Sequence, residues 1–426
     1  MKILQSRLSN GIRVISVPMK ERKSVSVGVW IHIGARDENE KLNGVSHFLE
    51  HLVFKGTATR TANQIKESVE GIGGSLNAFT SEEYTCFLAR SASSHLDQVF
   101  DVLSDMVLSA SLKDEDIKKE RTVIMEEIKM TQDQPSQLVD ELLTELMWPD
   151  HSLGRPIAGS LKSVGALSTR DIKGYRDQYY EPSLITIVAA GDVNQKKLTA
   201  LAKSYYQTSG FKNMKKIALF HGHQTKPRTK FVSKSTEQTH LALGVHAFSK
   251  VDPDEYPLEI LSVILGGNMS SRLFNRVREE RGLAYEIGSF VRKFHETGAF
   301  GVAAGVDNKK AEEALEVILE ELGGMSKMPV SPDELNRAKE FYLGQMALGL
   351  ESTMNNMLWA GEARVCLDRC RTSEEVSRKI KKVSAEDLRR VAKKLFKDHR
   401  FSLAVIGPDA VRLEKSSQKI LSAINR

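Results

Sequence analysis

The chain has 426 residues, which is too long for one ordinary hydrophobic core and predicts two or more domains. Its formal net charge is +6, but the lysines and arginines are interspersed with acidic residues and form no dense basic run, which disfavours nucleic acid as a partner. No segment approaches the roughly 20 consecutive apolar residues that span a membrane, so we expect no membrane partner.

The N-terminal residues have the pattern of folded protein. Residues 8–14 combine a turn sequence with the start of a strand at 13–17. They lack the charged, apolar and small-residue regions of a secretory signal. We therefore expect the protein to be cytoplasmic.

A longer strand is predicted over residues 24–33. Its apolar residues recur at every second position, which is typical of one buried strand face; they are Val25, Val27, Val29, Ile31 and Ile33. His32 belongs to the opposite face, and we expect it at the surface or at an interface.

Next along the chain, His47, Glu50 and His51 form the pattern H-x-x-E-H. On an α-helix the two histidines lie about 40° apart around the axis and about 6 Å apart along it. Two neutral imidazoles on one helix face supply two corners of a tetrahedral zinc site. Glu50 lies near the same face, where it can reach a metal-bound water and act as a general base.

The flanking residues favour a packed helix around this motif. Asn43 or Ser46 can cap its start. The apolar residues of its packed side are Val45, Phe48, Leu49, Leu52, Val53 and Phe54. A buried polar cluster without a metal is the alternative interpretation. It is disfavoured because two imidazoles and a carboxylate are costly to bury unless something pairs them, and a divalent cation does so well.

A capped amphipathic helix is predicted over residues 61–70, and a strand follows within 74–88. This strand carries small and polar residues and is entered through paired glycines. It is either an edge strand blunted against aggregation or an edge that accepts an extended peptide as an additional strand. The residues alone leave both interpretations open.

A third metal ligand must come from elsewhere, because a catalytic zinc has three protein ligands and one open position. Glu120 and Glu127 are seven residues apart on a predicted helix, so they share a face, while Glu126 points away. This face is the candidate for the third ligand.

The stretch H-F-L-E-H-L-V-F-K-G-T, followed by E-R-x-V-I-x-x-E, resembles the insulinase/pitrilysin family of zinc peptidases. It is most similar to the short-subunit branch that includes the mitochondrial processing peptidase β subunit. The resemblance implies that His47, His51 and Glu127 bind Zn²⁺ and that Glu50 is the base. It implies further that Glu120 supports the site from outside the ligand set.

The same resemblance extends to the strand within 74–88, whose segment G-G-x-x-N-A-x-T is similar to a substrate-binding edge in that family. It implies that Asn77, Ala78 and Phe79 bind the substrate, with Asn77 and Ala78 beside the scissile bond. Substrate docking is therefore favoured over a merely blunted edge.

The chain also resembles itself at an offset of about 215 residues. Residues 168–172 and 384–388 each open a helix that is followed by a strand. Such matches predict an α+β protein of two homologous domains, each a mainly antiparallel sheet packed with helices. We expect a catalytic, zinc-binding domain at 1–209, a linker at 210–228 and an inactive homologous domain at 229–426.

The second half lacks the metal motif. Residues 256–267, opposite the H-x-x-E-H helix, contain no histidine, and Gly344–Gln345 lie opposite Glu127. From the residues alone, the helix around Arg278 is an ordinary charged helix. The resemblance implies instead that Arg278 and Tyr285 reach the active site, where such donors suit a peptide carbonyl and the oxyanion formed from it.

Two further histidines and the three cysteines are also candidates for metal binding. His221 and His223 fall in the expected linker, where surface histidines are favoured over a second metal site. Cys366 and Cys370 are four apart, but without a nearby histidine pair they are better explained as structural thiols. Cys86 lies in a predicted strand and is expected in the core.

These observations predict a zinc-dependent endopeptidase, with one Zn²⁺ per chain, that hydrolyses peptides or unfolded polypeptide segments in extended form. Long-chain members of the resembled family enclose the site with four domains, so a two-domain chain should pair. A homodimer is the simplest pair, and a hetero-oligomer with a related subunit is the other arrangement. The alternative function is a non-catalytic or partner-dependent subunit of a processing-peptidase-like assembly. Such subunits characteristically lose part of H-x-x-E-H, which this chain retains.

Overall fold

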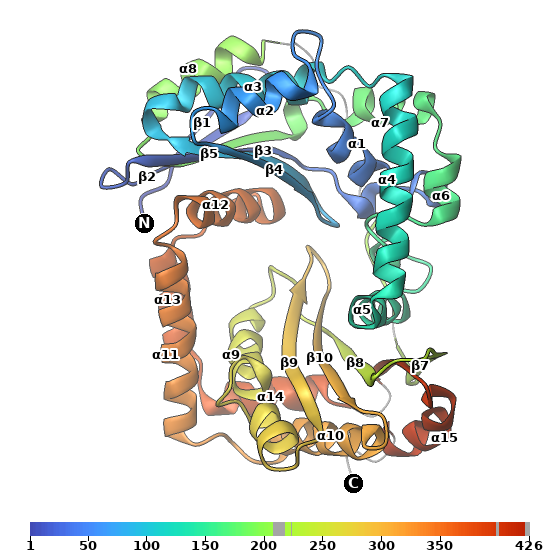
Figure 1. Ribbon diagram of the computed structural model, residues 1–426. Coiled ribbons are helices and arrows are strands. Elements are labelled where there is room, and N and C mark those ends of the chain that lie inside the picture. Colours follow the sequence, from blue (N-terminus) through green and yellow to red (C-terminus); the bar gives the residue numbers. More distant parts are fainter. Residues whose placement is uncertain (208–217, 223, 398–399, 422–426) are drawn as a thin grey trace. The chain divides into compact units, whose positions relative to one another are not determined.

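The computed structural model in Figure 1 describes residues 1–207, 218–222, 224–397 and 400–421. These residues form two compact units, each containing one β-sheet packed with helices. Neither unit is continuous in sequence. The first consists of Met1–Lys129, Arg155–Ala218 and Ala347–Glu374, and the second of Met130–Gly154, Leu219–Met346 and Glu375–Arg426.

The first unit contains a six-stranded sheet with the order β1-β2-β6-β3-β5-β4. Only β2 and β6 run parallel, and all other neighbours are antiparallel. The strands are β1 (Leu4–Arg7), β2 (Arg13–Pro18), β3 (Ser24–Ile31), β4 (Ser75–Thr80), β5 (Thr85–Ala92) and β6 (Ile185–Gly191). The predicted alternation from Val25 to Ile33 is confirmed, because all five of these apolar residues are buried in one cluster.

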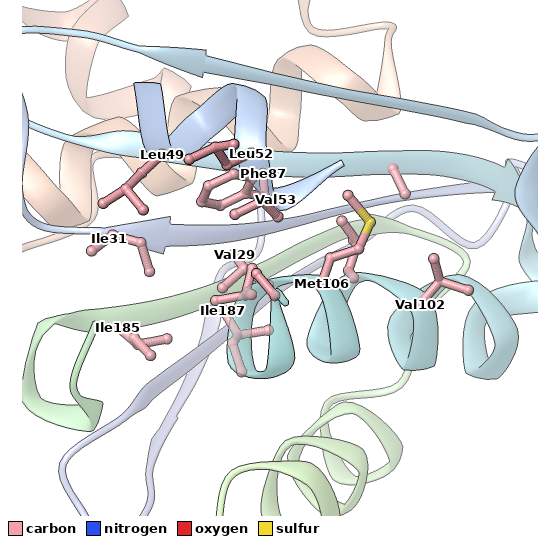
Figure 2. Packing of buried hydrophobic residues seen from close by; sticks show 14 of the residues in the cluster. Val29, Ile31, Leu49, Leu52, Val53, Phe87, Val102, Met106, Ile185 and Ile187 are labelled. Carbon is pink, nitrogen blue, oxygen red and sulfur yellow. The ribbon is translucent and has the colours of Figure 1, made fainter. Parts of the chain in front are cut away.

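Helices from all three sequence segments of the first unit pack around this sheet. They are α1 (Val45–Val53), α2 (Ala62–Glu70), α3 (Leu96–Ser109), most of α4 (Asp114–Asp133), α6 (Leu161–Ala166), α7 (Thr169–Tyr179), α8 (Gln195–Tyr205) and α12 (Thr353–Leu367). On one sheet face, α1 and α3 contribute Leu49, Leu52, Val53, Val102 and Met106 to a buried cluster with Val29, Ile31, Phe87, Ile185 and Ile187 (Figure 2). Full burial of a side chain of this size stabilises by about 1.5–3 kcal/mol.

The opposite face of the same sheet packs against α12. Because side chains alternate along a strand, Trp30, Cys86 and Val188 point to this second face and are buried with Met357 of α12. Gly361 allows the close approach of helix and sheet, since a Cβ atom there would lie 2.2 Å from the Trp30 ring. Helix α1, which carries the H-x-x-E-H motif, and α12 thus cover different faces of one sheet.

The second unit contains a five-stranded sheet with the order β7-β11-β8-β10-β9. Its strands are β7 (Arg228–Ser233), β8 (Gln238–Ala247), β9 (Ala284–Lys293), β10 (Gly298–Asp307) and β11 (Ser402–Gly407). Again one pair of neighbours is parallel, here β7 and β11, and the other neighbours are antiparallel. This order repeats β2-β6-β3-β5-β4, so the predicted class, two similar α+β domains with mainly antiparallel sheets, is confirmed.

One helix of the second unit, α5 (Pro135–Met147), comes from a segment that precedes the rest of the unit in sequence. The other helices are α9 (Glu255–Gly266), α10 (Ala311–Lys327), most of α11 (Pro332–Gly349), α13 (Ser373–Lys382), α14 (Ala385–Leu395) and α15 (Ala410–Leu421). In α5, Leu143 and Met147 pack against Ala242 of β8 and Ala404 of β11. Helices α4 and α11 each begin in one unit and end in the other, and the first two residues of α13, Ser373 and Glu374, belong to the first unit.

The predicted division at 1–209, 210–228 and 229–426 stays a prediction. The compact units differ from two continuous halves, because α5 packs with the second sheet and α12 with the first. Part of the expected linker, 208–217 and His223, lies outside the described residues. His221 is described and exposed.

The cysteines occur as free thiols. Cys86 and Cys366 are buried in the cluster between the first sheet and α12, and Cys370 packs against it, as expected of structural thiols. None of the described helices combines the length and apolar character needed to cross a membrane. The cytoplasmic location stays a prediction.

Candidate metal centre

The helix that carries the H-x-x-E-H motif begins at Gly44, which precedes Val45 as its N-cap. Gly44 has a φ of 96°, in the left-handed region that favours glycine. A Cβ atom at this position would also lie 2.7 Å from the carbonyl oxygen of Ala158. Gly44 therefore lets the chain turn sharply into α1, and its carbonyl accepts the first helical hydrogen bond from the Phe48 amide.

The start of α1 is capped by Glu38, and the expectation that Asn43 or Ser46 provides the cap is wrong. The Glu38 carboxylate accepts hydrogen bonds from the amides of Gly44 (2.7 Å) and Ser46 (2.8 Å). The Asn43 side chain also donates to Glu38 (3.2 Å). The first amides of a helix have no partner within it, so an outside acceptor can replace a cap from the helix's own residues.

The apolar side of α1 orients the two histidines. Phe48, Leu49 and Leu52 are buried in the core, so His47 and His51 project from the remaining face, with their ring centroids 4.6 Å apart. Burial, and secondarily the neighbouring His51, lowers the pKa of His47 to about 4. Its imidazole is therefore neutral near pH 7 and has a lone pair to offer to a metal.

Helix α4 brings a carboxylate to the two imidazoles. Glu127 places one oxygen 3.7 Å from Nε2 of His47 and the other 3.6 Å from Nε2 of His51. One ligand atom from each of these residues lies within 4.8 Å of the other two, and no other such group of three occurs in the described part of the chain. Tetrahedral zinc with bonds of roughly 2.0–2.1 Å requires ligand atoms about 3.4 Å apart, so this donor set fits the ion.

Glu120 lies on the same face of α4 as Glu127 and contacts the second ring nitrogen of His51, Nδ1. Its Oε1 lies 3.0 Å from Nδ1 of His51, and its Oε2 lies 2.6 Å from Nζ of Lys55. The Glu120 side chain is only 6% exposed. Donation from Nδ1–H to this carboxylate leaves the Nε2 lone pair directed at the side of Glu127. By contrast Glu126 points away and pairs with Lys129, as the spacing predicts.

Glu50 is held by the end of the edge strand. Burial raises the pKa of its carboxyl group, and the Thr80 hydroxyl, which donates to Oε2 at 2.8 Å, opposes this shift. Thr80 is the last residue of β4, so one hydrogen bond joins the motif helix to the strand.

Sequence reasoning missed the contacts of Thr80, Lys55 and Glu38. Signals for the first two were present: Lys55 lies four residues after His51, and Thr80 closes the segment G-G-x-x-N-A-x-T. Glu38 lies outside the motif, and its distance from the motif in sequence does not indicate that it contacts the helix start.

Strand β4 forms an edge of the first sheet, as predicted. Among the described residues it pairs with β5 on one side, with Asn77 opposite Leu88 and Ala78 opposite Phe87. Asn77 is exposed, and its side chain accepts a hydrogen bond from the Ala78 amide (2.8 Å). Phe79 packs toward the face covered by α12. An edge strand of this kind offers backbone donors and acceptors to a further strand.

Arg278 and Tyr285 belong to the second unit, where they contact each other. Arg278 lies in a π-helical turn, Phe274–Glu279, and its guanidinium carbon is 4.6 Å from the Phe274 ring centroid and 5.4 Å from that of Tyr285. Tyr285, the second residue of β9, is 75% exposed. The structure brings this pair together, and its role at the metal group stays a prediction.

Comparison with known proteins identifies both halves of the chain. Residues 13–161 match the insulinase (peptidase family M16) domain, and residues 166–342 match the peptidase M16 inactive domain. An uncharacterized zinc protease of Streptomyces coelicolor is 35% identical over 95% of this chain and 90% of its own length. The uncharacterized zinc protease YmxG of Bacillus subtilis is 35% identical over 94% of this chain and 97% of its own.

Solved structures show the same fold. A protease from Helicobacter pylori superposes with a TM-score of 0.91 at 25% identity, covering 96% of this chain and 99% of its own. A structure from Pseudomonas fluorescens, described as a peptidase M16 inactive domain, superposes with a TM-score of 0.86 at 18% identity, covering 96% and 98%. The whole-length similarity to relatives named zinc proteases shows that the chain belongs to the insulinase (peptidase M16) family.

Proposed function

We propose that the protein is a zinc-dependent endopeptidase that binds one Zn²⁺ per chain through His47, His51 and Glu127. The observation that carries this proposal is the convergence of two imidazoles and one carboxylate within 4.8 Å. Two histidines and one glutamate are typical of catalytic zinc sites, whereas structural sites favour closed cysteine and histidine sets. Membership in a peptidase family supports the same conclusion.

Glu50 has the position and environment of a general base. It lies one residue before a proposed ligand on the same helix, and Thr80 holds its carboxylate by a hydrogen bond. Zinc supplies Lewis acidity, which polarises a carbonyl group and lowers the pKa of a water molecule towards about 7. Glu50 would accept the proton of the attacking water and return it to the leaving amine. Burial raises the pKa of Glu50, which makes it a better proton acceptor than an exposed glutamate.

The substrate would bind in extended form along β4. Main-chain hydrogen bonds between an added strand and Asn77, Ala78 and Phe79 suit any peptide sequence, because they involve backbone groups alone. Arg278 and Tyr285 would donate to the scissile carbonyl and to the developing oxyanion. A folded protein rarely presents a free row of backbone groups, so short or unfolded polypeptides are the proposed substrates.

We propose further that two chains pair to enclose the site, in a homodimer or with a related subunit. A dimer chamber would admit extended polypeptides and exclude folded domains. Light scattering tests the pairing, and a specific interface should bury well above roughly 1,000 Å².

The deciding experiment is digestion of a mixed peptide library by the purified protein with and without a chelator. Cut sites that disappear with chelator and return on adding zinc support the proposal. The same library should be offered to Glu50→Gln, which retains every proposed ligand, to exclude a contaminating peptidase. A parent protein that binds no zinc and cuts no peptide would refute the proposed function.

A further inference from the structure

The short loop after β3 contacts two parts of the candidate site. Its residues 34–38 lead from the sheet towards α1. The Ala35 amide donates to the Ser81 carbonyl (3.0 Å), and the Arg36 amide donates to the Glu82 carbonyl (2.9 Å). Ser81 directly follows Thr80, the residue that holds Glu50. The loop is thus attached to the end of the edge strand at one side and ends at Glu38 on the other.

Glu38 is a buried carboxylate with a complete set of local donors. Besides the amides of Gly44 and Ser46 and the side chain of Asn43, Arg155 donates to its backbone carbonyl at 2.5 Å. Burial raises the pKa of the Glu38 carboxyl group to about 7, against the lowering effect of the hydrogen bonds from Ser46, Gly44 and Asn43. A buried carboxylate is unfavourable in itself, and here its donors are the first amides of the motif helix.

The two candidate histidine ligands are supported unequally. Nδ1 of His51 lies 3.0 Å from the Glu120 carboxylate. Nδ1 of His47 is buried and has no hydrogen-bond partner among the described residues. Ligating histidines are normally oriented by a partner on the second ring nitrogen. The orientation of His47 must therefore depend on the backbone that carries it, the first turn of α1.

We infer that Glu38 is a positioning residue for the metal group, acting through the helix start on His47. His47 is the third residue of α1 and directly follows Ser46. The Ser46 amide donates a hydrogen bond to the Glu38 carboxylate. Without this acceptor the first turn would fray, because Gly44 offers no side chain to cap it. When Glu38 is ionised, its negative charge at the helix N-terminus adds electrostatic support. The inference rests on the proposed zinc site and extends it to a residue outside the motif.

The experiment compares Glu38→Ala and Glu38→Gln with the parent protein. Alanine removes both acceptor oxygens. Glutamine keeps one of them and replaces the other by an NH2 group, which faces a donor instead of accepting from it. Alanine should therefore weaken zinc binding more than glutamine does. The affinity for zinc alone is measured by competition with a chromogenic chelator. We expect the dissociation constant to rise by about 10- to 100-fold, the range typical of lost outer contacts at metal sites.

Two matched controls separate positioning from general destabilisation. Glu40→Ala removes a carboxylate two residues away that is exposed. Ser168→Ala removes the side chain that caps α7, whose hydroxyl oxygen accepts a hydrogen bond from the Asp171 amide (3.1 Å). Both controls should bind zinc as the parent does. Glu38 variants that bind zinc with the parent's dissociation constant, although less stable, would overturn the inference.

A second readout requires no metal. Amide hydrogen exchange of the metal-free protein should speed up in the first turn of α1 in Glu38→Gln and stay unchanged in α2 and α8. Unchanged exchange in α1 would overturn the inference. If the parent binds no zinc, the proposed function is refuted, and the exchange comparison alone then decides whether Glu38 positions His47.

Discussion

The contact between Glu120 and His51 predicts a measurable loss of zinc affinity in Glu120→Ala. The substitution removes a hydrogen bond of 3.0 Å to Nδ1 of His51 and leaves the Lys55 ammonium without its partner at 2.6 Å. Hydrogen bonds to charged groups contribute about 1.5–3 kcal/mol. Since about 1.4 kcal/mol corresponds to tenfold in an equilibrium constant, the zinc dissociation constant should rise roughly 10- to 100-fold. The three proposed ligands remain, so binding should weaken without being abolished.

Chelator competition measures this change directly, and Glu126→Ala is its matched control. Glu126 lies on the same helix and loses the same charge, but its carboxylate is exposed and pairs with Lys129 at 2.7 Å. The control should bind zinc within about twofold of the parent, because exposed ion pairs contribute little. Equal affinities for Glu120→Ala and the parent would refute the supporting role of Glu120. A complete loss of zinc would instead make Glu120 a ligand.

Glu50→Gln should keep zinc and lose most turnover, because the proposed base is gone and the ligands remain; loss of the metal, measured by elemental analysis, would contradict the assignment. Tyr285→Phe should lower kcat/KM by about 10²-fold with zinc content unchanged, if one oxyanion donor is lost, and unchanged kinetics would return Tyr285 to an ordinary surface role. Burial lowers the pKa of His32 to about 3, so below pH 6.5 only the unfolded chain takes up this proton. Stability should therefore fall by about 2 kcal/mol from pH 7 to 5 through this residue. Denaturant titrations of His32→Gln should show a correspondingly shallower pH dependence.

Local sequence patterns predicted the parts of the site that lie on single helices. His47 and His51 converge because four residues span about one helical turn, and Glu120 and Glu127 share a face because seven residues span about two. The apolar alternation from Val25 to Ile33 likewise follows from the strand repeat. Each of these relationships depends on residues within one element, so spacing alone contains the information.

Contacts between elements could not be predicted in this way. Glu38 caps α1 from a loop six residues before Gly44, and its position depends on how that loop returns to the helix. His32 was expected at the surface or at an interface; it is partly buried, and its Nε2 lies 2.9 Å from the Thr186 hydroxyl of β6. Both contacts are tertiary, and a one-dimensional pattern does not encode them.

The exchange of α5 and α12 between the sheets is a further tertiary feature. Both helices bury apolar residues against a sheet, and the sequence does not state which sheet each covers. Helices α4 and α11 carry the chain from one unit into the other before α5 and α12 begin. The choice is made by complementary surfaces, such as Gly361 of α12 against the Trp30 ring.

Comparison of the two units also separates the residues that form the fold from the residues of the candidate metal site. Helix α9 follows β8 as α1 follows β3, and it buries Leu258, Ile260 and Leu261 without carrying a histidine. The order of the five strands that the two sheets share is nevertheless the same, so apolar positions suffice to specify the shared fold. The histidines and acidic residues are thus additions to polar faces of helices that the core already places. Their geometry must then be fixed by polar contacts outside the core, which is the part that Glu120 plays for His51 and that we assign to Glu38 for His47.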